Sequence, residues 1–231
     1  MTSLDAKTKT GGALGASGLI QFDLDGTILD TYEQILLSMR YTINGVYGKN
    51  FTDDELMYMV GVPIKQQFEY FVPEDPENAL KVYVDFERNK LNVDVKPFEG
   101  IEEALQELRT LNYKMVVVTS KRHVAAVNDL SKNNLLAYFE EVIGADDVLR
   151  GKPDPYPVIY AADTHGFPLQ NVIYIGDSPY DMQAAKSAGV FKIAVDWGMF
   201  SEETLMSFNP ESYIHSPHEI VPAVKSLIIP R

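Results

Sequence analysis

The sequence predicts an α/β protein with a doubly wound (Rossmann-like) parallel sheet, helices on both faces and an inserted group of helices. After Pro97, short apolar runs rich in β-branched residues alternate with helical patterns, as in sheets whose strands are buried on both faces. Before Pro97, about sixty residues keep helical spacing without a strand among them. A strand-like run precedes that stretch, so the helices are predicted to be an insert after the first strand.

The insert is expected to hold four helices. Apolar residues at helical spacing predict the first, and Thr52 with Glu55 has the form of a capping box for the second. A third is expected over 64–71. The fourth is expected to begin at Asp75-Pro76, because Asp is a good N-cap and Pro fits a first helical turn.

The sheet is built from five predicted strands, and helices separate those that follow the insert. The strands are expected at Leu19–Phe22, Met115–Val118, Glu141–Gly144, Val172–Ile175 and Lys192–Val195. The helices between them are expected from Ile101, over 123–133, from Asp154-Pro155 to Gly166, and from Ser178-Pro179 to Gly189.

Three parts of the chain follow from this pattern. A flexible leader is expected over 1–17, a catalytic core over 18–30 and 98–231, and a helical cap over 31–97. The glycine-rich end of the leader has no phosphate-loop spacing, and it precedes the first strand instead of following it. The leader is therefore expected to carry no phosphate site.

Composition limits the function. The 231 residues hold 33 acidic and 20 basic side chains, a formal net charge of −13. Such a field repels phosphate backbones, so no nucleic-acid partner is expected. No apolar run is long enough to span a membrane, and no signal peptide is visible. Cysteine is absent, which excludes thiol nucleophiles and fits the cytoplasmic location that we expect.

Polar side chains follow several strands at the point where each strand ends. Asp23 and Asp25 follow the first, Thr119-Ser120 the second and Asp177 a later one. Ligands of open α/β sheets bind at this edge, and clustered carboxylates suit a hard cation such as Mg²⁺. Because crowded carboxylates repel each other, a divalent ion or a lysine such as Lys152 is needed among them.

Four segments together resemble the motifs of the haloacid dehalogenase superfamily, in that family's order and spacing. Each alone is weak, whereas all four at strand ends or following loops make a specific pattern. The resemblance runs from about Leu19 to Val195, and it is closest to the phosphoglycolate-phosphatase-like members with a helical cap. The segments are Asp23–Thr27, Val118–Lys121, Gly151–Pro155 and Gly176–Asp181.

The resemblance implies roles for individual residues. Asp23 would be the nucleophile that forms an aspartyl-phosphate. Asp25 would protonate the leaving oxygen and then activate water. Thr119 and Lys152 would complete the catalytic group. Phosphate contacts are implied for Asp23, Gly26, Thr119, Ser120 and Lys152, although Ser120 stands where this subgroup usually has asparagine.

Mg²⁺ is the implied cofactor. The family binds it through the side chains that correspond to Asp23 and Asp177 and the backbone carbonyl that corresponds to Asp25. Asp181 and Ser178 would support the site from behind. Their spacing around Pro179 also fits a capping box, and both interpretations can hold together.

The function expected is a Mg²⁺-dependent phosphatase for a small phosphorylated metabolite, because a cap over the site excludes macromolecules. The alternatives are a β-phosphoglucomutase-like phosphotransferase and an inorganic pyrophosphatase. Carbon–halogen cleavage needs no acid at Asp25, and a binding module without turnover would usually lack Asp23 or Asp25. Phosphoglycolate, pyrophosphate, sugar phosphates and nucleotides stay open, as does monomer or homodimer.

A few further residues have two interpretations. Lys65, at the end of the turn that starts at Gly61, could meet a second anionic group of the substrate. Lys121 and Arg122 could steer an anion or form a solvated helix start. The aromatic residues of the insert are expected to pack its own core, and one or two of them could face the substrate; they are Phe68, Phe71, Tyr83 and Phe86.

Overall fold

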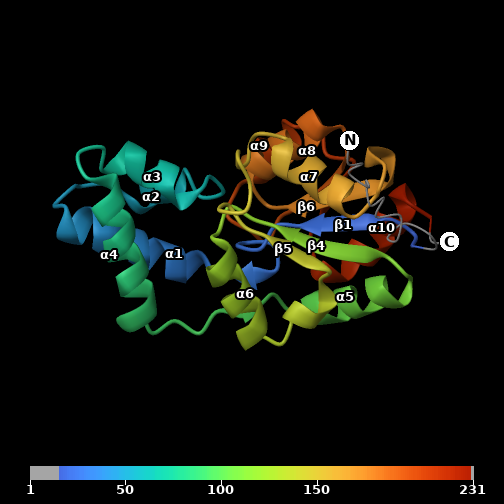
Figure 1. Ribbon diagram of the computed structural model, residues 1–231, viewed down its shortest axis with the longest axis horizontal. Helices are drawn as coiled ribbons and strands as arrows, with labels where there is room; N and C mark the ends of the chain where they lie inside the picture. The colour runs from blue at the N-terminus through green and yellow to red at the C-terminus, as the bar shows by residue number, and fades with distance from the viewer. Residues whose placement is uncertain (1–15, 230–231) are drawn as a thin grey trace, which may run out of the picture.

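The computed structural model describes residues 16–229. Nearly all of the predicted leader lies outside this range. Figure 1 shows the helices of residues 32–89 gathered at one end of the molecule and the sheet with its covering helices at the other. A sheet between helical layers with a helical insert is the predicted α/β architecture.

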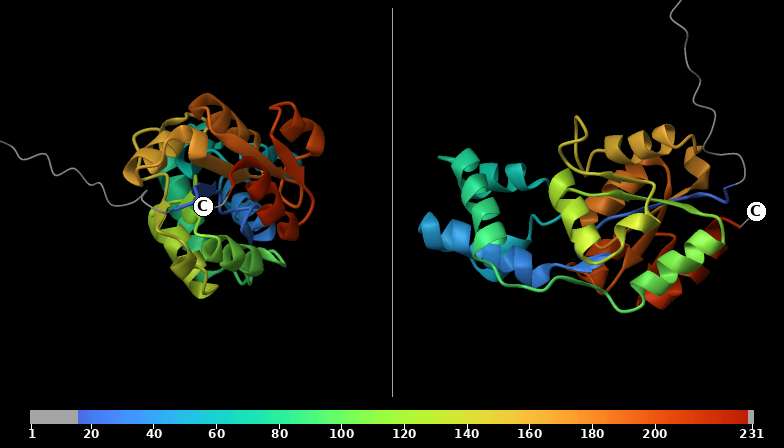
Figure 2. Two further views of the ribbon diagram at one scale, coloured as in Figure 1. Left: turned by 90° about the vertical axis from the view of Figure 1, so that its right-hand side faces the viewer. Right: turned by 60° about the horizontal axis from the view of Figure 1, so that its bottom comes forward.

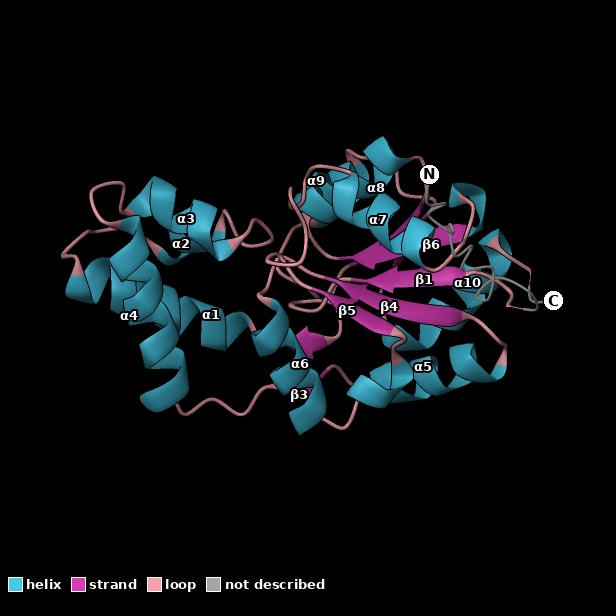
Figure 3. Cartoon of the chain, viewed as in Figure 1, coloured by secondary structure: helices cyan, strands magenta, loops and turns pink. Residues whose placement is uncertain are grey.

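The main sheet is parallel throughout, in the order β5-β4-β1-β6-β7-β8. The carboxyl ends of its strands point toward the cap, as the arrowheads in Figure 3 show. A separate antiparallel pair, β2 (Leu29–Asp30) with β3 (Lys96–Pro97), lies where the chain leaves and re-enters the core. The main strands are β1 (Leu19–Phe22), β4 (Lys114–Val118), β5 (Glu141–Ile143), β6 (Val172–Gly176), β7 (Phe191–Val195) and β8 (Ser212–Ile214).

Apolar side chains on both faces bury the sheet between two helical layers. In β1, Leu19 packs with the layer of α7 and α8, whereas Ile20 and Phe22 pack with the opposite layer, as the two-residue period of a strand requires. Figure 2 shows the layers from two further sides. One layer holds α7 (Tyr156–Thr164) and α8 (Pro179–Ala188), and the other α5 (Ile101–Thr110), α6 (His123–Lys132) and α10 (Ile220–Leu227).

The cap has an apolar core of its own, centred on Met39, Ile43 and Phe68. Tyr83 belongs to it, as expected for the aromatic residues of the insert. The predicted capping box of Thr52 and Glu55 is present. The cap consists of α1 (Tyr32–Met39), the π-helical segment η1 (Arg40–Val46), α2 (Asp53–Met57), α3 (Ile64–Phe71) and α4 (Pro76–Asn89).

Several features differ from the expectation. Asp75 precedes α4, but its side chain makes no capping hydrogen bond, and its carboxylate instead accepts one from Tyr47 Oη at 3.1 Å. The prediction that the sheet ends with β7 is wrong, because β8 adds a further strand. The pair β2 and β3 was not predicted either, and β3 lies within the stretch 31–97 that was expected to hold helices without a strand. The other elements that were not predicted are α9 (Glu202–Met206), α10 and the 3₁₀ turns 136–138, 169–171 and 217–219.

Within residues 16–229, no helix is both long enough and apolar enough to span a membrane.

Candidate active site

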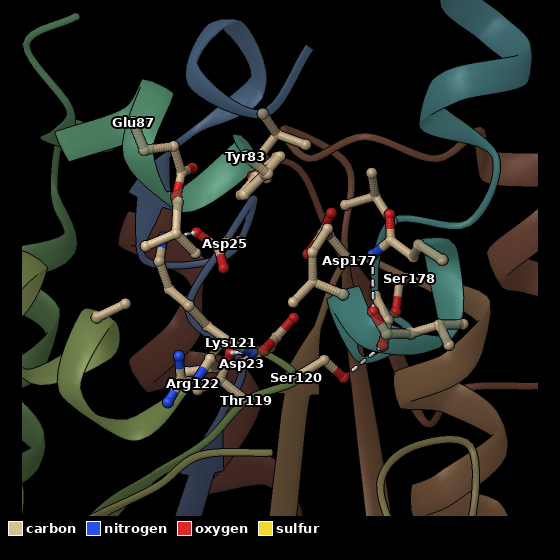
Figure 4. Close-up of a pocket in the computed structure, with 18 of the residues that line it drawn as sticks. Asp23, Asp25, Tyr83, Glu87, Thr119, Ser120, Lys121, Arg122, Asp177 and Ser178 are labelled. Atoms are coloured by element: carbon tan, nitrogen blue, oxygen red, sulfur yellow. Dashed lines mark hydrogen bonds and ion pairs between the residues drawn. The ribbon is translucent and has the colours of Figure 1, made fainter. Parts of the chain in front are cut away.

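The loop after β1 separates its two acids. The backbone N–H of Asp23 donates to the carbonyl of Ile175 in β6 at 2.9 Å, which fixes Asp23 at the sheet edge, where it is buried. Asp25 turns away from it and forms an ion pair with Lys121 at 2.8 Å. Figure 4 shows Asp25 nearer to Tyr83 and Glu87 of the cap than Asp23 is. The two acids thus face different parts of one cavity.

Carboxylates from two strand ends and one helix meet beside β1. Asp23, Asp177 and Asp181 are buried, and each offers an oxygen within 4.8 Å of the others. Asp177 is held by Thr27 Oγ1, which donates to Oδ1 at 2.8 Å, and by the N–H of Met199, which donates to Oδ2 at 3.0 Å. The predicted gathering of Asp23 and Asp177 is therefore present in the structure.

Lys152 is the cation of this group. Its Nζ lies 2.9 Å from Asp23 Oδ1 and 2.5 Å from Asp181 Oδ1, and its side chain is almost wholly buried. It also donates to Tyr174 Oη at 3.1 Å. Burial lowers the pKa of the Lys152 ammonium, but the carboxylates of Asp181 and Asp23 raise it by more, so it lies above its ordinary value. Lys152 is therefore charged when it meets Asp23.

Asp181 has its oxygens occupied. Oδ2 accepts hydrogen bonds from Ser178 N at 3.0 Å and Ser178 Oγ at 2.6 Å, and the capping box at the start of α8 is complete. Oδ1 accepts from Lys152. The capping interpretation of the Ser178–Asp181 pair is confirmed. Because both oxygens are engaged, Asp181 is better placed to orient Lys152 than to hold a cation itself.

Asp23 and Asp177 resist ionisation as long as no further positive charge is present. Burial raises the pKa of Asp23 well above its usual range, and the charge of Asp181 adds to this more than Lys152 offsets. Burial, with the charge of Asp181, likewise raises the pKa of Asp177 to about 7. When all three carboxylates are ionised, the ammonium of Lys152 leaves a net charge of two negative units. All the candidate ligand atoms for a metal ion are carboxylate oxygens. This donor set fits a hard divalent cation such as Mg²⁺.

The end of β4 supplies two hydroxyl groups with different partners. Thr119 is buried, and its Oγ1 accepts a hydrogen bond from Lys121 N at 3.1 Å. Its own proton stays available to a phosphoryl oxygen. Ser120 Oγ instead donates to the carbonyl of Gly61 in the cap at 2.5 Å. The phosphate contact proposed for Ser120 therefore rests on its backbone N–H.

Gly26 gives Asp177 its room. A Cβ at Gly26 would lie 2.4 Å from Asp177 Oδ2, and the residue has a φ of +79°. Its N–H donates to the carbonyl of Leu29 at 2.9 Å. The phosphate contact expected of Gly26 stays a prediction. The structure does show that a side chain at this position would collide with Asp177.

We expect Gly26→Ala to lower the free energy of unfolding by about 2–4 kcal/mol, because strain at a positive φ adds to the collision with Asp177. Gly166→Ala is the matched control, since Gly166 has a φ of +70° and no atom within 4 Å of its Cβ position. Urea denaturation of both variants measures the difference. Equal destabilisation of the two variants would show that the contact with Asp177 costs nothing.

A cavity of about 90 Å³ lies between the core and the cap. Core residues Asp23, Asp25, Thr119 and Asp177 line one side (Figure 4). Lys65, the candidate for a second anionic group, does not line it but faces neighbouring hollows of the surface. The cap residues that line it are Ile35, Val60, Gly61, Val62, Ile64, Gln67, Tyr83, Val84 and Glu87.

Several residues of the site were not found from the sequence. The sequence left Lys121 as either a residue that steers an anion or part of a solvated helix start, yet its side chain is only 12% exposed and lies between Asp25 and Asp129, 2.8 Å from each. Tyr174 lay inside a predicted strand, and its hydroxyl donates to the carbonyl of Val118 at 2.7 Å. Met199 could have been sought from its place after the end of β7, where the strand-end rule applies.

Comparison with known proteins decides the family. The model of the haloacid dehalogenase-like hydrolases matches residues 20–195. The chain belongs to this family. It is a phosphoric ester hydrolase of the haloacid dehalogenase-like type, and the resemblance found in the four motifs is confirmed.

Individual relatives have related names. "Putative pyrophosphatase PpaX" of Caldanaerobacter subterraneus is 33% identical over 206 residues, which is 89% of this chain and 94% of that protein. A structure described as a predicted phosphatase from Clostridium acetobutylicum has a TM-score of 0.78 and 28% identity, covering 92% of this chain and 100% of its own. A predicted phosphoglycolate phosphatase from Haemophilus somnus has a TM-score of 0.76, with 89% and 96% coverage, and at 22% identity shows the fold alone.

Proposed function

We propose that the chain is a Mg²⁺-dependent phosphatase that hydrolyses a small phosphorylated metabolite through an aspartyl-phosphate on Asp23. The contact between Asp23 and Lys152 carries the proposal. A buried carboxylate at a strand end, 2.9 Å from a buried ammonium and beside Asp177, can approach an anionic phosphorus only where positive charge is concentrated. The core over 18–30 and 98–231 supplies these groups in our proposal, and the cap over 31–97 covers them.

The proposed reaction has two steps. An oxygen of Asp23 forms a bond to phosphorus as the bond from phosphorus to the leaving oxygen breaks, and Asp25 gives that oxygen its proton. Asp25 then accepts a proton from water, which attacks the phosphorus and releases Asp23 and phosphate. Lys152 and the hydroxyl of Thr119 hold phosphoryl oxygens in both steps. Mg²⁺, held by Asp23, Asp177 and the carbonyl of Asp25, would supply positive charge against the phosphoryl oxygens.

The cap supports a small substrate. It contributes apolar side chains to the cavity, and the hydrogen bond from Ser120 to Gly61 links the two parts beside the site. A substrate enclosed on both sides is separated from bulk water, which strengthens the electrostatic interactions within the cavity. A folded phosphoprotein does not fit such a space.

Pyrophosphate is the second candidate, and the name of the Caldanaerobacter relative favours it. Its leaving group is a phosphate, whereas a phosphate ester leaves an alcohol. A mutase of the β-phosphoglucomutase kind would use the same Asp23 but would pass the phosphoryl group to a sugar hydroxyl, without net release of phosphate. A cytoplasmic location and a monomer or homodimer stay predictions.

Phosphate release from a panel of esters and pyrophosphate tests the function. With Mg²⁺ we expect release that saturates with substrate, and with excess chelator we expect at least a hundredfold loss, since Asp23 and Asp177 lose their counter-charge. Release that is unchanged by the chelator would contradict the metal requirement. Conversion of a sugar phosphate to its isomer without free phosphate would favour the mutase instead.

A further inference from the structure

The wall of the cavity that the cap provides is uncharged apart from one acid. Among the described residues, no lysine or arginine of the cap lines the cavity, and Glu87 of α4 is its single ionisable carboxylate there. Figure 4 shows Glu87 and Tyr83 across the cavity from Asp23 and Thr119. A leaving group bound to a phosphoryl at Asp23 would extend toward this wall.

Gln67 offers this wall a hydrogen-bond acceptor without a partner. The side chain is 5% exposed and lines the cavity. Its Nε2 donates to the carbonyl of Val62 at 2.7 Å, which sets the orientation of the amide because the opposite orientation would face two oxygens. Its Oε1 is buried and has no partner among the described residues. A buried acceptor of this kind is costly unless a ligand or water donates to it.

The cations that line the cavity on the core side are already paired. Lys121 Nζ lies 2.8 Å from Asp25 Oδ1 and 2.8 Å from Asp129 Oδ2. Arg122, which is half exposed, lies 3.4 Å from Asp146 through its Nε. A second anionic group at this end would therefore compete with Asp25 for Lys121 and with Asp146 for Arg122, and it would lie beside the lining carboxylates Asp25 and Glu87.

We propose that the physiological leaving group is an uncharged alcohol that bears a further hydroxyl, and that this hydroxyl donates to Gln67 Oε1 with Glu87 as a second acceptor. This inference rests on the phosphatase function proposed above, and it narrows the class of substrate. The substrate class is a phosphate monoester of a small polyol or sugar. Phosphoglycolate and pyrophosphate, whose leaving groups carry negative charge, are disfavoured.

The full chain with saturating Mg²⁺ tests this with four probes of similar size. We expect kcat/KM to be highest for glycerol 3-phosphate and about tenfold lower for propyl phosphate, which lacks the hydroxyls. Phosphoglycolate and pyrophosphate are expected to fall below propyl phosphate. If either anionic probe is cleaved as well as glycerol 3-phosphate, the inference is wrong.

Substitutions test whether Gln67 causes the preference for glycerol 3-phosphate over propyl phosphate. Gln67→Met keeps the length of the side chain but removes the acceptor, so the ratio of kcat/KM for glycerol 3-phosphate to that for propyl phosphate is expected to fall about tenfold. Gln66→Met is the matched control, since Gln66 is exposed and does not line this cavity, and its ratio should equal that of the wild type. If Gln67→Met lowers both substrates equally, Gln67 has only a structural part and the inference fails.

Glu87→Gln tests the charge. Burial raises the pKa of Glu87 to about 7, so the comparison is made at a pH above 8, where this carboxylate is ionised. Removing its charge is expected to raise the ratio of kcat/KM for phosphoglycolate to that for glycerol 3-phosphate by about three- to tenfold. Glu77→Gln, on the exposed side of α4, should leave the ratio unchanged. An unchanged ratio in Glu87→Gln would contradict the inference.

4-Nitrophenyl phosphate distinguishes the proposed phosphatase function from the proposed leaving group, because the cleavage of this ester does not depend on contacts with Gln67 or Glu87. If it and all four probes yield no Mg²⁺-dependent phosphate, the phosphatase function itself fails. If it is cleaved while glycerol 3-phosphate is no better than the anionic probes, the phosphatase function stands and only the inference about the leaving group is wrong.

Discussion

Asp23→Asn is expected to abolish phosphate release, with a loss of about a thousandfold or more in kcat. The amide is a poor nucleophile toward phosphorus, so the covalent step has no attacking oxygen. The shape is kept, and the amide oxygen can still accept a hydrogen bond from Lys152. Since burial and the charge of Asp181 raise the pKa of Asp23, a neutral side chain there should also leave the folded state at least as stable without metal.

The measurement is phosphate release under Mg²⁺, with the phosphoenzyme sought by intact mass after an acid quench. Wild type should gain the mass of one phosphoryl group, and Asp23→Asn should not. Asp30→Asn is the matched control, because Asp30 is exposed on β2 outside the cavity. Activity of Asp23→Asn within tenfold of wild type would reject covalent catalysis through this residue.

Asp177→Asn is expected to stabilise the metal-free protein at pH 8 by on the order of 2 kcal/mol, and to remove the stabilisation that Mg²⁺ gives. Burial raises the pKa of Asp177 to about 7 from an ordinary 3.8. The amide needs no proton to be neutral. It can also keep both contacts of Asp177, by accepting from Met199 N and donating to Thr27 Oγ1.

The direction in which pH changes the stability of the folded protein follows from proton binding. Between about pH 4 and pH 7 the folded protein holds a proton on Asp177 that the unfolded chain has lost, so this contribution to stability falls as pH rises. It is fully present below about pH 4 and lost above about pH 7. In chelator, the advantage of Asp177→Asn over wild type should therefore be near zero at pH 4 and grow toward pH 8.

Urea denaturation at several pH values, with chelator and with Mg²⁺, measures this. Wild type at one hundred times the dissociation constant for Mg²⁺ should gain about 2.7 kcal/mol, and Asp177→Asn should gain little. Asp163→Asn, on the exposed side of α7, is the control for loss of an acid elsewhere. A variant that Mg²⁺ stabilises as much as wild type would show that Asp177 is not a ligand.

Local patterns predicted much of the fold. The apolar runs of β1, β4 and β6 and the spacing of α3 depend on neighbouring residues alone, and they appear within a residue of where the sequence places them. β8 was missed because it is only three residues long, and Ile214 is its one buried residue. A strand of this kind has little apolar pattern of its own, and its pairing with β7 defines it.

The groups that follow the strand ends could be found from the sequence alone. Asp23, Thr119 and Asp177 meet because parallel strands bring their carboxyl ends to one edge, wherever the rest of the chain goes. The pairing of the remaining charges depends on how distant segments pack together. Lys121 meets Asp25 across 96 positions of sequence, and Gln67 and Glu87 face the core only because the cap folds over it. Burial and charge pairing between distant segments do not change the hydrophobic periodicity of the sequence. Each partner therefore has the local sequence pattern of an ordinary surface residue.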